Sequence, residues 1–418
     1  MSNNKSILVV GGGISGLTAA IEAAEVGYNV YLVEKNAYLG GRVAQNNQYF
    51  PKLCPPSCGL EINFRRIKNN PRIKFYTLSE VEEISGEEGA YEVKIKVNPR
   101  YVNENCTACG ECAKVCSTEI SNPFNYGMDK VKAAYLPHEF AFPMRYVIAP
   151  EIIGTEEAQK CKDACKYNAI DLEMKPETIT VNPSAIIWAT GWQPFDPSKV
   201  EYYGFEKHKN VITNVMMERL AANNGPTKGK IVRPSDGKEI GSIAFVQCAG
   251  SRDENYLPFC SSVCCLASLK HANYVREQYP EAKIYIFYID IRALGKYEEF
   301  YTKIANDEKV FLIKGKVAEI VEDPETGTLT VTAEDQLSGK LTKETVDMVV
   351  LATGMVPSTA QEKVPADVSY DENGFIVLDD SKKGIYGAGC VKRPMDVASS
   401  VRDATAAALK AIQSTVRR

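Results

Sequence analysis

Cysteines are the residues of this chain whose number and spacing most clearly indicate chemistry. There are 13 of them in 418 residues, and ten fall into tight clusters. The polar start Met1–Ser6 does not resemble a signal peptide. The sequence also contains no run of about 18 apolar residues, the length that a membrane-spanning helix needs. The sequence therefore predicts a cytoplasmic protein, and in that reducing compartment clustered thiols favour metal or cluster ligation over disulfides.

The first cysteine cluster has the spacing of a bacterial ferredoxin motif, and a second half-motif that lacks two cysteines follows it. The first motif consists of Cys106, Cys109, Cys112 and Cys116, and the half-motif of Cys161 and Cys165. In such ferredoxins the fourth cysteine of each motif serves the other cluster. This crossing predicts one [4Fe–4S] cluster, held by Cys106, Cys109, Cys112 and Cys165. Cys116 and Cys161 are too few for a second cluster, and a zinc site is the alternative to the first.

A second cluster of thiols lies in the middle of the chain. Cys248 ends an apolar run and is followed by Cys260, Cys264 and Cys265. Because Cys260 and Cys264 are one helical turn apart, we expect both on one side of a helix start. Four thiols in this span predict a second [4Fe–4S] cluster, with buried structural thiols as the alternative.

A glycine-rich turn near the N-terminus predicts a dinucleotide site. The segment GGGISG, residues 11–16, stands between an apolar strand and a helix, and a second strand ends at Glu34. In this context Gly11 permits the tight turn, Gly13 the approach of a pyrophosphate, and Gly16 close helix packing. The pyrophosphate would lie at the helix N-terminus, with Glu34 accepting hydrogen bonds from the adenosine ribose.

Other segments favour FAD over NAD. Gly41 and Arg42 follow the second strand, where two-domain flavoprotein reductases bring the chain to the flavin phosphates, and two apolar strands end in Ala-Thr-Gly. Residues 384–390 resemble the segment before the helix that faces the flavin in such proteins. Cys390 replaces its usual aspartate, so the hydrogen bond to the ribityl chain must be made differently. The predicted cofactor-binding residues are Gly11, Gly13, Ile14, Ser15, Gly16, Glu34, Lys35, Gly41, Arg42, Ala189, Thr190, Gly191, Gly354, Gly389 and Cys390.

The second half of the chain lacks the fingerprint of a nicotinamide site. A strand at 243–247 should be followed by G-x-G-x-x-G if this part bound NAD(P)H, but it is followed by the cysteines that begin at Cys248. The sequence therefore predicts that a one-electron carrier occupies the place of the nicotinamide. The flavin would then convert between two-electron and one-electron steps.

These segments predict an α/β protein with two Rossmann-like domains of the FAD-dependent disulfide-reductase type and a ferredoxin-like insertion in the FAD domain. The FAD domain would comprise residues 1–98, 173–200 and 346–418, the insertion 99–172, and the second domain 201–345. The net charge of −4 comes from 49 basic and 53 acidic residues spread along the chain. This balance argues against nucleic acid and anionic membrane surfaces as partners.

Three motifs resemble the heterodisulfide reductase A protein, the flavin-binding component of that enzyme: QCAGSRD (247–253), FCSSVCC (259–265) and YIDIRALG (288–295). The likeness extends over nearly the whole chain, the insertion included. That larger protein has a further N-terminal cluster module and a C-terminal ferredoxin, both absent from this sequence. The resemblance implies FAD, two [4Fe–4S] clusters and partner subunits.

Within this family, the short form with a degenerate insertion is most similar to the flavoprotein component of the quinone-interacting membrane-bound oxidoreductase complex of sulfate reducers. That complex links the menaquinone pool to cytoplasmic adenylylsulfate reductase. The resemblance implies three partners: adenylylsulfate reductase, a homologous flavin/iron–sulfur protein, and a membrane haem/quinone protein. The chain would be peripheral to the inner membrane through these partners. The alternative is the flavin subunit of a heterodisulfide-reductase-like complex, with or without electron bifurcation.

Lys270 and Cys390 are the residues expected to act on the flavin. Lys270 follows Cys265 on a helix that should face the isoalloxazine, where its charge would stabilise the anionic reduced flavin; a solvated helix lysine is the alternative. Cys54 and Cys58 lie near the position of the redox pair of disulfide reductases, although structural or surface cysteines are favoured. Three histidines are scattered and indicate no metal or acid–base centre. Two competing hypotheses are a stand-alone NAD(P)H- or disulfide-linked reductase and a scaffold with redox-silent cofactors.

Overall fold

The computed structural model describes residues 6–377 and 384–416 and divides the chain into two compact units. The first comprises residues 1–192, 357–393 and 397–418, and the second comprises 193–356 and 394–396. The prediction that Met1–Ser6 is not a signal peptide concerns residues that, except for Ser6, lie outside the described part of the chain.

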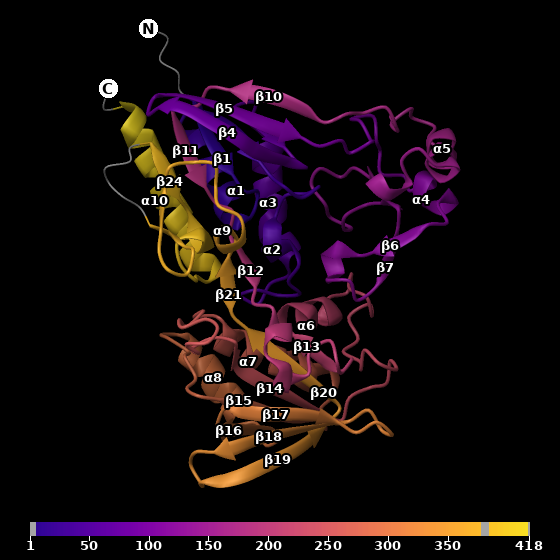
Figure 1. Cartoon of the computed structure of the whole chain (residues 1–418), viewed down its shortest axis with the longest axis vertical. Helices are drawn as coiled ribbons and strands as arrows, with labels where there is room; N and C mark the ends of the chain where they lie inside the picture. The colour runs from indigo at the N-terminus through magenta and orange to yellow at the C-terminus, as the bar shows by residue number, and fades with distance from the viewer. Residues whose placement is uncertain (1–5, 378–383, 417–418) are drawn as a thin grey trace. The chain divides into compact units, whose positions relative to one another are not determined.

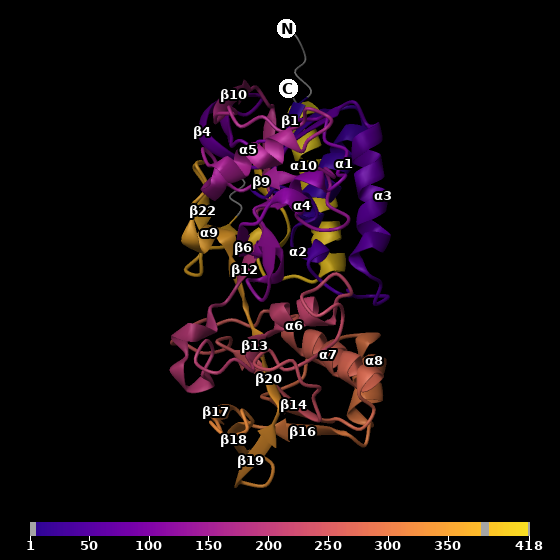
Figure 2. The same cartoon turned by 90° about the vertical axis from the view of Figure 1, so that its right-hand side faces the viewer.

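The first unit is built on a five-stranded parallel sheet (Figure 1). The strand order is β24 (Ile385–Gly387), β11 (Ala185–Trp188), β1 (Ser6–Val10), β2 (Asn29–Val33) and β3 (Ile73–Tyr76). One face packs on α1 (Ile14–Glu25), α3 (Pro56–Asn69) and α10 (Val397–Val416), which Figure 2 shows on the same side. The other face packs on an antiparallel sheet of β10 (Glu177–Val181), β5 (Ala90–Val97) and β4 (Ser79–Glu87). Burial of both faces explains why the central strands are continuous apolar runs.

The predicted insertion interrupts the antiparallel sheet, because its chain leaves at the end of β5 and returns to pair with β5 through β10. It has a small core of its own. Figure 1 shows its helices beside one another at the edge of the unit remote from α10. Its elements are α4 (Glu111–Val115), α5 (Glu156–Asp163), β6 (Glu119–Ser121), β7 (Lys130–Lys132), β8 (Ala134–Tyr135), β9 (Val147–Ile148), η1 (Pro123–Asn125) and η2 (Pro150–Ile152).

The second unit repeats this architecture. Its parallel sheet has the order β13 (Val211–Thr213), β20 (Met348–Thr353), β14 (Ser242–Ala249), β15 (Lys283–Tyr288) and β16 (Val310–Lys314). The helices are α6 (Asn214–Ala221), α7 (Cys264–Gln278) and α8 (Tyr297–Ala305), and the antiparallel sheet consists of β17 (Val317–Glu322), β18 (Leu329–Asp335) and β19 (Lys340–Val346). Two Rossmann-like units were predicted, and this α/β fold is confirmed.

Both boundaries predicted for the second unit were misplaced, because residues 193–200 and 346–356, assigned to the FAD domain, belong to the second unit. Residues 346–356 were assigned to the FAD domain because the strand there ends in Ala-Thr-Gly. Instead β20 pairs in parallel with both β13 and β14, so it is an inner strand of the second sheet. The remaining short elements are α2 (Gly41–Ala44), α9 (Ser358–Gln361), β12 (Trp192–Pro194), β21 (Met355–Pro357), β22 (Ser369–Tyr370), β23 (Ile376–Val377), η3 (Pro197–Lys199), η4 (Glu201–Tyr203) and η5 (Gly389–Val391).

Candidate flavin and iron–sulfur sites

The glycine turn between β1 and α1 leaves no room for side chains. A Cβ on Gly11 would lie 2.3 Å from the carbonyl oxygen of Ala189, and one on Gly16 would lie 1.7 Å from the carbonyl oxygen of Gly11. A Cβ on Gly41 would lie 2.7 Å from Cα of Gly13, where its φ of +54° also favours glycine. Because no side chain caps the N-terminus of α1 at Gly13, the first helical amides are available to a phosphate.

Glu34 follows β2 beside this turn, as predicted. Its Oε2 accepts a hydrogen bond from the Gly12 amide (2.6 Å), and its Oε1 accepts two from Asn36 (2.7 and 2.8 Å). Burial raises the pKa of Glu34, although these donors oppose the shift. The carboxylate is therefore held in place by the turn, with lone pairs left for the hydroxyls of an adenosine ribose.

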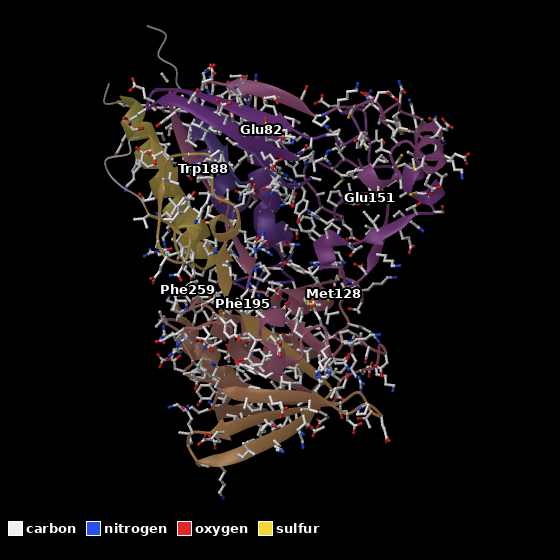
Figure 3. All side chains as sticks on the ribbon, in the orientation of Figure 1. Glu82, Met128, Glu151, Trp188, Phe195 and Phe259 are labelled. Atoms are coloured by element: carbon white, nitrogen blue, oxygen red, sulfur yellow. The ribbon has the colours of Figure 1, made fainter. Side chains whose placement is uncertain are left out.

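The end of β11 supplies the other wall of the turn. Ala189 is buried, and the Thr190 hydroxyl is a buried polar atom without a hydrogen-bond partner. A buried hydroxyl of this kind is usually satisfied by a ligand or water. Trp188 ends β11 just before it (Figure 3). The glycine cradle, the free amides of α1, Glu34 and Thr190 together fit the adenosine and pyrophosphate of FAD.

Arg42 and Lys35, both predicted to bind the cofactor, have different environments. Arg42 donates from Nε to the Trp192 carbonyl oxygen (2.6 Å) and from Nη1 to the Tyr126 hydroxyl (3.0 Å), and its guanidinium lies 4.8 Å from the centroid of the Trp192 ring. Since Tyr126 belongs to the insertion, Arg42 ties the insertion to the flavin-binding segment. Lys35 is exposed and pairs with Glu362 (3.0 Å), so it has no such anchoring role.

The turn at Gly389 and Cys390 lies next to the start of α1. A Cβ on Gly389 would lie 2.1 Å from the Ser15 hydroxyl, and the Gly389 amide donates to Asp403 Oδ2 (2.8 Å). Cys390 is buried, with Sγ 3.8 Å from the Ser400 hydroxyl. Sequence reasoning noted the missing aspartate but did not find Asp403, whose carboxylate reaches this turn from α10. Only the packing of α10 could have identified it.

The pKa values of Cys112 and Cys161 show which other thiols of the insertion lie near each of them, and Cys112 also acts on Cys161. Burial raises the pKa of the Cys112 thiol to about 11. Three neighbouring thiols raise the pKa of Cys112 further: Cys106, Cys109 and Cys165, which are the other predicted ligands. For Cys161, burial raises the pKa to about 12, and Cys116 is the thiol that reinforces the shift most.

The four thiols of the second unit form one group at the junction of β14 and α7. Burial raises the pKa of Cys248 to about 11 and that of Cys264 well above its ordinary value. The thiols that reinforce the shift at Cys264 are Cys248, Cys265 and Cys260. Cys248 has a φ of +55° beside a register shift in β14, a backbone conformation uncommon outside glycine. The expected helical pairing of Cys260 with Cys264 is wrong, because α7 begins only at Cys264.

Charged residues that sequence reasoning did not single out surround this second group of thiols. Arg252 pairs with Asp290, and both lie close to the thiols. Arg252 lowers the pKa of Cys248, and the Arg292 amide lowers that of Cys265, although burial outweighs both. Cys265 Sγ donates to the backbone carbonyl oxygen of Asp290 (3.7 Å). Such donors and charges tune a bound cluster.

No three Cys, His, Asp or Glu side chains in residues 6–377 and 384–416 converge as ligands of a single metal ion do. A zinc site would bring such ligands to one ion. Thiols around a cubane instead bind separate irons at its corners. A cluster at each group of thiols stays a prediction.

Lys270 is not a solvated helix lysine, the alternative left open by the sequence. It is 5% exposed, and its Nζ lies 2.7 Å from Glu218 Oε1, which also contacts His271 Nε2 at 2.6 Å. Burial raises the pKa of Glu218, but Lys270 and His271 outweigh it and lower the pKa to about 2. Burial lowers the pKa of His271. These three residues form a buried ionisable cluster, although the histidines had suggested no acid–base centre.

Three further predicted residues lie apart from these groups. Gly354 belongs to the second unit, where a Cβ would meet the hydroxyls of Ser251 and Ser261, so close packing explains the glycine. Cys54 is half-buried and Cys58 is exposed at the start of α3, and neither is in a disulfide.

Comparison with known proteins identifies a flavoprotein family at the N-terminus and relatives over nearly the whole chain. The model of the family described as FAD dependent oxidoreductase matches residues 6–51, the segment of the glycine cradle. An iron–sulfur component of CoB–CoM heterodisulfide reductase from Methanopyrus kandleri, its A protein, is 42% identical over 97% of this chain and 63% of the relative. The A protein of the H2:CoB–CoM heterodisulfide, ferredoxin reductase of Methanothermobacter thermautotrophicus is 37% identical over 98% of this chain and 64% of its own. The chain thus spans a little under two thirds of these relatives.

Solved structures show the same fold at low sequence identity. The thioredoxin reductase of T. acidophilum has a TM-score of 0.54 with 17% identity, covering 99% of both chains. That of Lactococcus lactis has a TM-score of 0.55 with 14% identity, covering 99% of this chain and 100% of its own. No described helix is long and apolar enough to cross a membrane. The chain is therefore similar over nearly its whole length to the heterodisulfide reductase A protein, matches the FAD dependent oxidoreductase family at residues 6–51, and has the fold of a thioredoxin reductase.

Proposed function

We propose that this chain is a flavin and iron–sulfur electron-transfer subunit of a heterodisulfide-reductase-like complex. One observation carries the proposal. At the carboxyl end of β14, where a Rossmann-like unit binds nucleotide phosphates, Cys248 and the thiols that precede and begin α7 form a group. Thiolates there can hold a cluster, whereas a pyrophosphate needs a glycine turn.

The residues of each unit have distinct roles in this function. In the first unit, the amides of α1 would bind the pyrophosphate, and Glu34 would orient the adenosine. Bound FAD would supply the exchange between two-electron and one-electron chemistry. In the second unit, Arg252 and the Arg292 amide would stabilise the negative charge of thiolate-bound iron. Lys270, whose ammonium group pairs with the Glu218 carboxylate, remains the predicted partner of the reduced flavin.

Cofactor content of the anaerobically purified chain tests the proposal. We expect about one FAD and about eight irons per chain, as two cubanes require. Cys264→Ala should remove about half of the iron and leave the FAD content unchanged. Wild-type iron content in Cys264→Ala would contradict the proposal.

A second candidate, a stand-alone NAD(P)H- or disulfide-linked reductase, is favoured by the thioredoxin-reductase fold and by Cys54 and Cys58. Bleaching of the flavin by NADPH in the purified chain, together with disulfide reduction that is lost in Cys58→Ser, would support it. The missing glycine fingerprint after β14 predicts no bleaching.

We also propose a finer assignment, made from the resemblance alone: relay between the menaquinone pool and adenylylsulfate reductase in sulfate respiration. Its other partners would be a membrane haem/quinone protein together with a homologous flavin/iron–sulfur protein, and the chain would be peripheral to the inner membrane. Electron transfer from the reduced chain to purified adenylylsulfate reductase, compared with transfer to a heterodisulfide-cleaving protein, would distinguish this assignment from the general one. Faster transfer to the heterodisulfide-cleaving protein would contradict it.

A further inference from the structure

The half of the insertion that lacks two cysteines retains Cys116 and Cys161, and neither side chain reaches solvent. Cys116 follows α4 and is 2% exposed, and Cys161 lies on α5 and is 0% exposed. Both belong to the small core of the insertion. In a two-cluster ferredoxin these two positions would be corners of a second cubane.

Each of these two thiols donates a hydrogen bond to a backbone carbonyl oxygen. Cys161 Sγ donates to the carbonyl of Cys112 at 3.5 Å, and Cys116 Sγ donates to that of Thr118 at 3.6 Å. The first contact connects the incomplete half to a predicted ligand of the complete half. Two thiols supply only two of the four corners of a cubane, so these contacts fit a role of Cys116 and Cys161 in the packing of the insertion.

A carboxylate fixes the loop that follows Cys116. Glu157 Oε1 accepts hydrogen bonds from the Ser117 amide, from the Ser117 hydroxyl (2.8 Å) and from the Thr118 amide (3.1 Å). Glu157 and Cys161 are four residues apart on α5 and so share one face. The face that holds residues 117–118 therefore also brings Cys161 towards Cys116 and the Cys112 carbonyl.

We propose that this half of the insertion binds no cluster and has become a protein-only support for the other half, in which Cys161 positions the backbone of Cys112 and Glu157 fixes the loop after Cys116. The inference rests on the proposed function in one respect, since it assumes a cluster at Cys112. Cys161 is thus a positioning residue, acting on the cluster only through the backbone of its ligand.

Iron content and iron release in the full chain test both parts. The double variant Cys116→Ala/Cys161→Ala should retain the iron content of the parent. Cys161→Ala should release iron of the insertion to a chelator roughly tenfold faster, the lower end of the usual effect of removing a ligand's supporting contact. Cys161→Ser, which keeps a donor, is the matched control and should release iron at close to the parent rate. Release is followed in a Cys248→Ala background, so that the iron measured comes from the insertion.

Two results would overturn the inference. Loss of about four irons in the double variant, with FAD content unchanged, would mean that Cys116 and Cys161 hold a cluster. Equal release rates in Cys161→Ala, Cys161→Ser and the parent would remove the positioning role. Failure of the proposed function is a separate result, because it would appear as wild-type iron in Cys264→Ala. Unchanged FAD content shows that each variant has folded.

Discussion

Three of the four predicted ligands of the insertion lie near solvent, with Cys112 buried, whereas three of the four in the second unit are buried. Cys109 is exposed and Cys106 and Cys165 are half-buried, but of the four thiols in the second unit only Cys260 is not buried. Solvent exposure, hydrogen bonds to sulfur and nearby charge set the potential of a cluster. An exposed cluster also lies within reach of a partner protein. If each region binds its predicted cluster, we expect the insertion to exchange electrons with partners and the second unit to hold an internal carrier.

The two regions also differ in how their charges are compensated. The second unit places Arg252 and Asp290 beside its thiols and has the buried cluster of Glu218, Lys270 and His271 on α6 and α7. Beside the insertion thiols, the group that lowers the pKa of Cys112 is the neutral Ala113 amide, and the nearby Glu157 carboxylate adds no positive charge. A negatively charged cluster deep in protein needs such compensation, whereas solvent supplies it at the surface.

The largest expected effect compares one ligand from each region. Cys264→Ala should remove about four irons, because a buried corner admits no replacement ligand. Cys109→Ser should keep most of its iron, since a hydroxyl or solvent oxygen can occupy an exposed corner. Iron and FAD are assayed on anaerobic protein, with Cys58→Ala as a control outside both groups. Equal iron loss in the two variants would show that burial does not distinguish the regions.

Glu218→Gln tests the buried charges of the second unit. It leaves Lys270 buried without its partner carboxylate, a change that costs about 3–5 kcal/mol of stability in buried pairs. Hydrogen exchange of the α7 amides, which reports that helix directly, should show the loss. The matched control is Glu362→Gln, which breaks the exposed pair with Lys35 and should cost less than about 1 kcal/mol. Similar protection of α7 in the two variants would contradict the assigned role.

On the acid side, the pH dependence of α7 should begin nearer neutral pH than that of the insertion, where hydrogen bonds from Ser117 and Thr118 lower the pKa of Glu157 to about 2. The folded pKa of Glu218 is about 2, below the unfolded value of about 4.3, so its contribution is present above pH 4.3 and lost as pH falls towards 2. The lowered pKa of His271 acts in the same direction below about pH 6.5. Hydrogen exchange from pH 7 to about 2 covers both ranges, and Glu218→Gln should flatten the lower part. An unchanged profile in that variant would assign the acid sensitivity to other groups.

The smallest expected effect concerns potentials. Arg252→Gln removes a positive charge beside Cys248 and should lower the potential of the second-unit cluster by on the order of 50 mV, close to a tenfold change for a one-electron couple. Lys166→Gln, next to the insertion ligand Cys165, should have a smaller effect because solvent screens it. Redox titration followed by EPR measures both. A larger shift for Lys166→Gln would reverse the comparison.

Local sequence was sufficient for the features that depend on backbone freedom and ligand spacing. The glycines at 11 and 16 lie where a Cβ would meet backbone atoms, and the division of the insertion thiols into groups of four and two stays a prediction from the ferredoxin spacing. The parallel Rossmann-like sheets were also predicted from apolar strands and the glycine-containing turns that follow them. These features are encoded within a few residues of one another.

Only the tertiary structure decided which distant side chains share a buried environment. It placed β20 in the second sheet, began α7 at Cys264, and brought Asp403 to the turn at Gly389. It also showed that Lys270, for which the sequence left a solvated helix position open, is buried and pairs with Glu218. The free energy of a buried charge depends on the groups packed against it, and those groups come from elements far apart in the chain. Residue type and spacing therefore determined the cofactors to expect, and packing determined the charges that surround them.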